Sequence, residues 1–109
     1  PDLVLSLHVN NNKNITTSGF EIFVSDKSLA YEKSNELAQK LVLDFEKNIP
    51  LKNRGVKKAP FFVLSKSEVP ALTLEMGFIS NQNDRNYITS EEGQNQIAQT
   101  ILNFVSGLK

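Results

Sequence analysis

The sequence contains no cysteine and only one histidine, His8. Without cysteine the chain has no disulfide bond, no thiolate metal site and no cysteine nucleophile. A catalytic zinc site takes about three protein ligands, most of them histidines. This chain therefore cannot build a two-histidine zinc site from its own residues.

A net charge is also absent, because 12 lysines and arginines balance 12 aspartates and glutamates. Such a chain exerts no broad electrostatic attraction on nucleic acid or on an anionic membrane surface, so we expect no nucleic-acid partner. No apolar run reaches the roughly 18 residues of a transmembrane helix, so we expect no membrane span. Nucleophile-elbow, phosphate-loop and dinucleotide-binding glycine motifs are missing as well.

What is present is the composition of one small domain. The chain has 109 residues, of which 39% are hydrophobic and 22% charged. This balance is sufficient for a buried core and is not typical of a disordered chain. We predict a single domain over residues 1–109, without internal repeats.

Four short segments are predicted to be strands. The first, Leu3 to Val9, is nearly all apolar, which is typical of a strand buried on both faces of a parallel sheet. It ends at the run Asn10-Asn11-Asn12. Further strands are predicted at residues 20–24, 60–64 and 71–75, with a basic loop at residues 51–59.

Helical spacing of apolar residues predicts a long helix from about Leu29 to Asn48, with N-cap residues at 25–28 and Pro50 as its end. A short helix is expected at residues 85–88. A final helix follows a capping box formed by Thr89 and Glu92. Strands that alternate with helices predict an α/β fold with a mostly parallel central sheet flanked by helices.

Glu75 stands out because it ends the apolar run of the fourth predicted strand. An ionised carboxylate in apolar surroundings is costly unless it is paired, hydrogen-bonded or close to a metal. His8 is next to last in the first predicted strand. If the two strands are parallel, both side chains reach the edge of the sheet where ligands bind in open α/β folds.

Each of these residues also fits a structural role. A lone histidine near a strand end, such as His8, is often simply structural. Glu75 also fits a carboxylate that caps backbone N–H groups or pairs with Arg54 or Arg85. The residues alone leave both interpretations open.

Two further features have alternative interpretations. Glu21 fits either a solvated or ion-paired strand residue or a residue that lines the site. The basic segment Lys52 to Lys58 fits either a solvated turn or a contact with an anionic substrate.

Several motifs together resemble those of the zinc-dependent N-acetylmuramoyl-L-alanine amidases, a family of cell-wall hydrolases. The segment Ser6-Leu7-His8-Val9-Asn10 is similar to the family's Ser-x-His-Ala-Asn motif. The segment from Leu74 to Asn81 is similar to its Glu-x-Gly-Phe-Ile-Ser-Asn signature. Other similar segments follow in family order at residues 19–23, 54–57, 62–64, 70–72 and 97–98. The resemblance spans nearly the whole chain.

The resemblance implies hydrolysis of the amide that joins N-acetylmuramic acid to the L-alanine of the stem peptide. It implies that His8 is a zinc ligand and that Glu75 is the catalytic glutamate, which moves a proton from water to the leaving amine. The family's other histidine and glutamate ligands precede the matched region, so the remaining zinc ligands are expected upstream of Pro1. We therefore interpret residues 1–109 as the C-terminal part of an amidase catalytic domain whose N-terminal segment is missing.

The resemblance also implies a bacterial protein that meets peptidoglycan in the periplasm, or outside the cell in association with the cell wall. A non-catalytic peptidoglycan-binding or interaction module on the same scaffold is the alternative. A zinc hydrolase of similar topology that acts on another amide is a third hypothesis. Without the upstream segment a sheet edge is expected to be open, so we predict that the isolated chain is marginally stable or associates.

Overall fold

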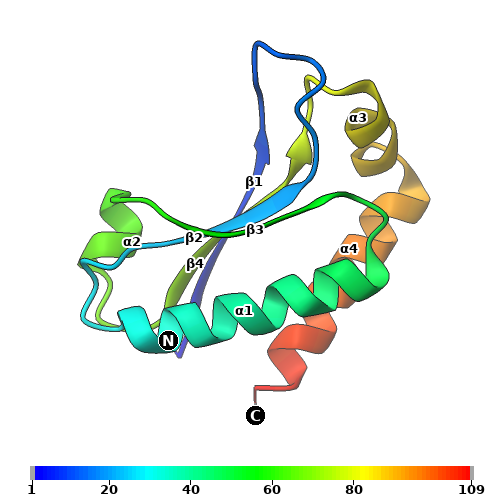
Figure 1. Cartoon of the computed structure of the whole chain (residues 1–109). Coiled ribbons are helices and arrows are strands. Elements are labelled where there is room, and N and C mark those ends of the chain that lie inside the picture. The colour runs from blue at the N-terminus through cyan, green and yellow to red at the C-terminus, as the bar shows by residue number, and fades with distance from the viewer. Residues whose placement is uncertain (1, 109) are drawn as a thin grey trace.

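The computed structural model describes residues 2–108, and a single four-stranded sheet lies at its centre (Figure 1). The strands are Val4–Asn10 (β1), Phe20–Val24 (β2), Asn53–Lys58 (β3) and Ala71–Phe78 (β4). Their order in the sheet is β1-β4-β2-β3. β1 is parallel to β4 and β2 is parallel to β3, whereas β2 and β4 are antiparallel. Most pairings are parallel, as predicted, and the antiparallel pair in the middle makes the sheet mixed.

Four helices surround the sheet: Tyr31–Asn48 (α1), Phe62–Lys66 (α2), Gln82–Ile88 (α3) and Glu91–Ser106 (α4). α1 runs along the sheet and packs against β2, β3, β4 and α4. α2 contacts β4 at one end of the sheet, and α3 contacts β4 and α4 at the other. The predicted α/β architecture is therefore confirmed. No helix within residues 2–108 is both long enough and apolar enough to cross a membrane.

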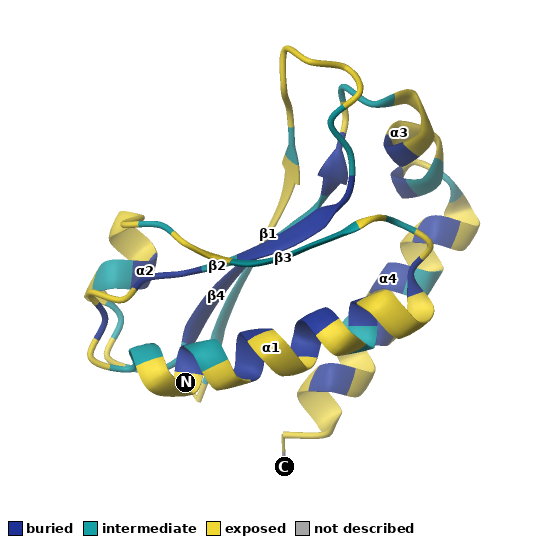
Figure 2. Ribbon diagram, viewed as in Figure 1, coloured by how far each residue is buried: buried dark blue, intermediate teal, exposed yellow. Residues whose placement is uncertain are grey.

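The apolar core lies between one face of the sheet and the helices α1 and α4. Phe20 and Phe45 are fully buried there, with ring centroids 5.2 Å apart. Figure 2 shows β2 and β4 as largely buried strands, in contrast to the exposed loop that follows β1. Other core residues on the sheet are Ile22, Val24, Leu72 and Leu74. Because side chains alternate along a strand, Glu21 and Glu75 project from the opposite face.

Two predictions for the middle of the chain were wrong. The segment predicted as a basic loop contains β3, which the apolar pattern misses because Val56 is its only large apolar residue. The strand predicted at residues 60–64 is instead helix α2. A short apolar run does not distinguish a strand from a helix, and here the helical turn buries Leu64 while Phe62 is 74% exposed.

β1 also differs from its prediction, because it is not buried on both faces. It is an edge strand in the described part of the chain, and its residues Leu7 and Val9 are 48% and 46% exposed. The expected open edge is thus present at β1. An apolar edge strand offers free backbone N–H and C=O groups to another chain.

The residues that precede helices α1 and α4 differ from the predicted N-caps. Ser90, not Thr89, caps α4 by accepting a hydrogen bond from the N–H of Gly93 at 2.9 Å. Thr89 instead donates its hydroxyl to the carbonyl of Arg85. α1 follows Ala30, which has no side-chain cap of its own.

Candidate active site

His8 and Glu75 are direct cross-strand partners in the parallel pair β1–β4. The prediction that their side chains reach the same edge is therefore confirmed. His8 is exposed, whereas Glu75 is half-buried. The pair combines an accessible imidazole with a carboxylate that is partly shielded from water.

The carboxylate of Glu75 is not fully satisfied. Its Oε2 atom is buried and has no hydrogen-bond partner within residues 2–108. Burial raises the pKa of the Glu75 carboxyl above its ordinary value; the neighbouring His8 opposes this rise and Glu21 adds to it. This shift favours the protonated form of the Glu75 carboxyl compared with that of an exposed glutamate.

The arginines considered as partners of Glu75 have other contacts. Arg54 donates its Nε–H to Glu21, and Arg85 donates an Nη1–H to the carbonyl of Ile79 at 2.8 Å. No backbone N–H caps Oε2 of Glu75 in the described residues either. The structural interpretation of Glu75 as a paired or capping carboxylate is therefore not supported at this oxygen.

Glu21 lies opposite Glu75 in the antiparallel pair β2–β4 and is only 4% exposed. Its Oε2 accepts hydrogen bonds from Arg54 Nε at 3.2 Å and from Lys57 Nζ at 2.9 Å. Asn10 Nδ2 lies 3.4 Å from Oε1. Glu21 is thus an ion-paired residue, and it is also the neighbour of the candidate base. His8, Glu75 and Glu21 form a row across three adjacent strands.

The strand β4 is irregular directly after Glu75. The register with β1 shifts between His8 and Asn10, which is the mark of a bulge, and Gly77 has a φ of +137°. Bulges are common beside active sites because they redirect neighbouring side chains. Here the irregularity leads the chain from β4 into the turn before α3.

Asp84 anchors this turn, and the sequence analysis did not identify it. Its side chain is 3% exposed, and its Oδ2 accepts the N–H groups of Gly19 at 2.8 Å and Phe78 at 2.9 Å. One carboxylate therefore holds the start of β2 against the end of β4. The available signal was the spacing Asn81-x-x-Asp84, which is typical of an N-cap and the first helical turn.

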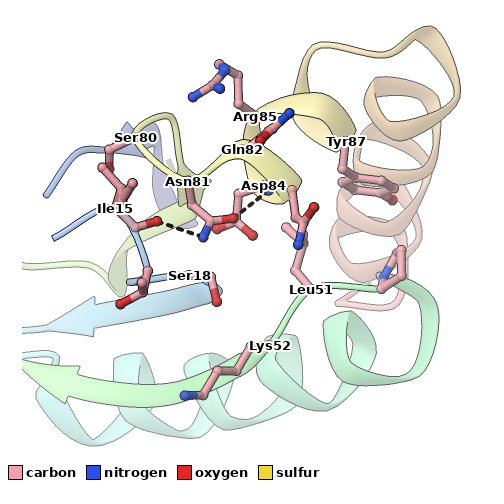
Figure 3. Close-up of a pocket in the computed structure, with 13 residues that line it drawn as sticks. Ile15, Ser18, Leu51, Lys52, Ser80, Asn81, Gln82, Asp84, Arg85 and Tyr87 are labelled. Atoms are coloured by element: carbon pink, nitrogen blue, oxygen red, sulfur yellow. Dashed lines mark hydrogen bonds between the residues drawn. The ribbon is translucent and has the colours of Figure 1, made fainter.

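A hollow of about 820 Å³ lies between the loop after β1, the start of β3 and helix α3 (Figure 3). Asn81 crosses it, donating to the carbonyl of Ile15 at 3.0 Å and accepting from the N–H of Asp84 at 3.0 Å. Neither His8 nor Glu75 lines this hollow. The hydrogen bonds of Asn81 in this hollow join the loop after β1 to the start of α3, which is a structural role. We therefore place the candidate active site at His8 and Glu75 instead.

The described residues supply only part of a metal site. Within residues 2–108 no group of three histidine, aspartate or glutamate side chains is positioned to hold a metal. The exposed imidazole of His8 fits one ligand, and the unpaired oxygen of Glu75 fits a neighbouring base. These two residues do not complete a coordination shell.

A profile of the N-acetylmuramoyl-L-alanine amidases matches residues 1–106. The chain belongs to this family. The similarity inferred from the motifs around His8 and Glu75 is thereby confirmed. The match also covers the segments that the motifs alone left unassigned.

Named relatives and solved structures agree with this assignment. An uncharacterised Bacillus subtilis protein, YqiI, is 33% identical over 94% of the chain, and the B. subtilis amidase LytC is 31% identical over 92%. The crystal structure of an N-acetylmuramoyl-L-alanine amidase from Clostridium difficile 630 superposes with a TM-score of 0.88 at 32% identity over 97% of the chain. The Nostoc punctiforme amidase AmiC2 gives 0.87 at 30% identity over 98%.

The chain spans only part of these proteins. It covers 48% of YqiI and 20% of LytC. It covers 56% of the C. difficile amidase chain and 57% of the N. punctiforme chain. The similarity therefore extends over one portion of the amidase fold.

Proposed function

We propose that this chain is the C-terminal part of the catalytic domain of a peptidoglycan amidase, which hydrolyses the bond between N-acetylmuramic acid and the L-alanine of the stem peptide. The observation that carries the proposal is the buried, unpaired oxygen of Glu75 beside His8 at one sheet edge. Membership of the amidase family supports the reaction class. Relatives named as probable cell wall amidases support a location at the cell wall, which we propose to be periplasmic or extracellular.

Glu75 acts as the general base and then as the general acid. It accepts a proton from the attacking water and returns it to the nitrogen of the leaving L-alanine. Its pKa is raised by burial, which brings the carboxyl closer to the pH at which both transfers are efficient. Glu21, with its two cationic partners, lies beside Glu75 in a supporting position.

His8 is proposed as one zinc ligand, and the remaining ligands are expected upstream of Pro1. A bound zinc ion polarises the amide carbonyl and lowers the pKa of the attacking water. The position of His8 supports this role, because its imidazole is exposed and lies directly opposite Glu75. The base is thus within one strand spacing of the proposed metal ligand.

The test is release of stem peptides with a free N-terminal alanine from muropeptides, measured by mass spectrometry. It uses the longest form of the protein that carries this chain, loaded with zinc. Glu75→Gln is expected to lower turnover by about 10²–10⁴-fold, the usual contribution of a positioned acid–base group. Glu68→Gln, which removes an exposed carboxylate, is the matched control.

Turnover of Glu75→Gln close to that of the unmodified protein would refute the acid–base role. Peptidoglycan binding without any hydrolysis by the unmodified protein would instead favour the alternative, a non-catalytic binding module.

A further inference from the structure

Two cations of β3 converge on one carboxylate. Arg54 and Lys57 both contact Oε2 of Glu21, at 3.2 Å and 2.9 Å. One cation is enough to neutralise the carboxylate of Glu21, so that ion pair does not by itself require Arg54. The opposite carboxylate, Glu75, forms no ion pair with either cation within residues 2–108.

Arg54 is held rigidly on several sides. A side chain at Gly19 would lie 3.0 Å from the Cγ atom of Arg54, so the arginine stem fills the space beside that glycine. The guanidinium carbon lies 5.2 Å from the ring centroid of Phe78. Its Nε–H is used by Glu21. An arginine fixed in this way loses little further conformational entropy when it binds a ligand.

The donors at the tip of Arg54 remain available. Neither Nη group donates a hydrogen bond within the described residues, and the side chain is 27% exposed. Paired terminal N–H groups of arginine match the two oxygens of a carboxylate. The ammonium of Lys57, which is 43% exposed, lies on the same Glu21 oxygen and adds positive charge.

The distance from the candidate base suits a peptide. Glu75 is on β4 and Arg54 is on β3, with β2 between them. The two backbones are two strand spacings apart, but the side chain of Arg54 reaches back to Glu21, the direct cross-strand neighbour of Glu75. Its guanidinium therefore lies about one strand spacing, roughly 5 Å, from Glu75. An extended peptide covers about 3.3–3.6 Å per residue. A group one to two residues beyond an amide placed at Glu75 therefore reaches the tip of Arg54.

We propose that Arg54, assisted by Lys57, binds a carboxylate on the leaving peptide, one to two residues beyond the cleaved amide. The inference rests on the proposed function, because it takes the cleaved amide to lie at Glu75. Glu21 is a positioning residue, since it orients both cations without contacting the peptide. If Arg54 only neutralised Glu21, Lys57 would make it redundant and its Nη groups would have no role.

The test compares binding of two soluble muramyl peptides, one with a free carboxylate at this position and one with a carboxamide. Binding is followed by NMR titration in the Glu75→Gln background, in which hydrolysis does not interfere. Arg54→Gln is expected to weaken binding of the acid peptide by about tenfold or more and to leave binding of the amide peptide unchanged.

Lys58→Gln is the matched control. It removes the same charge from the same strand, but its ammonium lies 5.5 Å from the ring centroid of Tyr31, away from Glu21. Both peptides are expected to bind this variant as they bind the parent protein. If Lys58→Gln and Arg54→Gln lost equal affinity for the acid peptide, the loss would be explained by the change in net charge, and the proposal would be overturned.

Arg54→Lys keeps the ion pair with Glu21 and covers the case in which Arg54→Gln does not fold. It is expected to lose much of the preference for the acid peptide; full preference in this variant would overturn the proposal. The two proposals fail separately. If the unmodified protein prefers the acid peptide but cleaves no muramyl peptide, the carboxylate site stands and the amidase function is refuted. If it cleaves muramyl peptides but binds the acid and amide peptides equally, the amidase function stands and the carboxylate site is refuted.

Discussion

Glu21 of β2 and Glu75 of β4 lie directly opposite each other, yet within residues 2–108 only Glu21 forms ion pairs with lysine or arginine. Like charges in cross-strand positions destabilise a sheet. Both cations pair with Glu21, whereas the buried oxygen of Glu75 has no hydrogen-bond partner within residues 2–108. This asymmetry leads to a prediction about pH.

We expect Glu75→Gln to stabilise the fold at neutral pH and to have no such effect in acid. The folded-state pKa of Glu75 is raised above its ordinary value of 4.5. The folded protein therefore binds more protons than the unfolded chain between these two values, and stability falls as the pH rises through that window. Urea unfolding over a pH series measures the difference. Because part of the carboxylate meets solvent, the expected gain is about 1 kcal/mol.

The exposed Glu68→Gln is the control for this experiment and is expected to give no pH-dependent difference. A constant stability difference between Glu75→Gln and the unmodified protein at all pH values would contradict the prediction.

Asp84→Ala is expected to destabilise the protein by about 2–4 kcal/mol, because two buried backbone N–H groups lose a charged acceptor. Hydrogen exchange provides a local readout, since the amides of Gly19 and Phe78 should lose their protection together. Asp26→Ala, at an exposed position, should stay within about 0.5 kcal/mol of the unmodified protein. Unchanged protection of both amides in Asp84→Ala would show that the carboxylate does not hold the two segments.

Gly19 and Gly55 should differ sharply in their tolerance of alanine. Both have positive φ angles, +115° and +83°. A Cβ atom at Gly19 would lie 2.4 Å from the carbonyl oxygen of Lys52, whereas a Cβ at Gly55 meets nothing within 4 Å. We expect Gly55→Ala to cost about 1–2 kcal/mol from backbone strain alone, and Gly19→Ala to cost clearly more. Thermal unfolding tests this, and equal costs would contradict the role assigned to the close contact at Gly19.

The open edge at β1 predicts self-association of the isolated chain. Leu7→Lys places a charge on this edge and should reduce association, which sedimentation velocity measures. Leu43→Lys is the control, because it adds the same charge at a 65% exposed position on α1. A similar reduction by both variants would point to charge in general rather than to the edge.

Regular apolar patterns predicted β1, β2, β4, α1 and α4, because each of these elements buries side chains with a fixed period. β3 has no such pattern, since much of its interaction with the rest of the sheet is made by polar side chains: Arg54 and Lys57 bind Glu21. α2 was mistaken for a strand because its apolar residues are mostly exposed and follow no period of burial.

The same reasoning explains what was predicted at the site. Glu75 does not end its strand as predicted, because β4 continues to Phe78. His8 and Glu75 were nevertheless located, because both stand in the C-terminal halves of strands that are parallel partners. The neighbourhood of Glu21 depends on the antiparallel pairing of β2 with β4 and on β3, and no local pattern encodes either. Whether His8 binds metal and Glu75 transfers protons remains a prediction for the experiments above.

The pairing of Val4 with Ala71 has a consequence for synthesis. Ribosomes add roughly 5–20 residues per second, so β1 emerges several seconds before the strand with which it pairs. During that interval β1 and β2 have both been made, but the strand that joins them in the sheet has not. The sheet over residues 2–108 therefore closes only once β4 has been made.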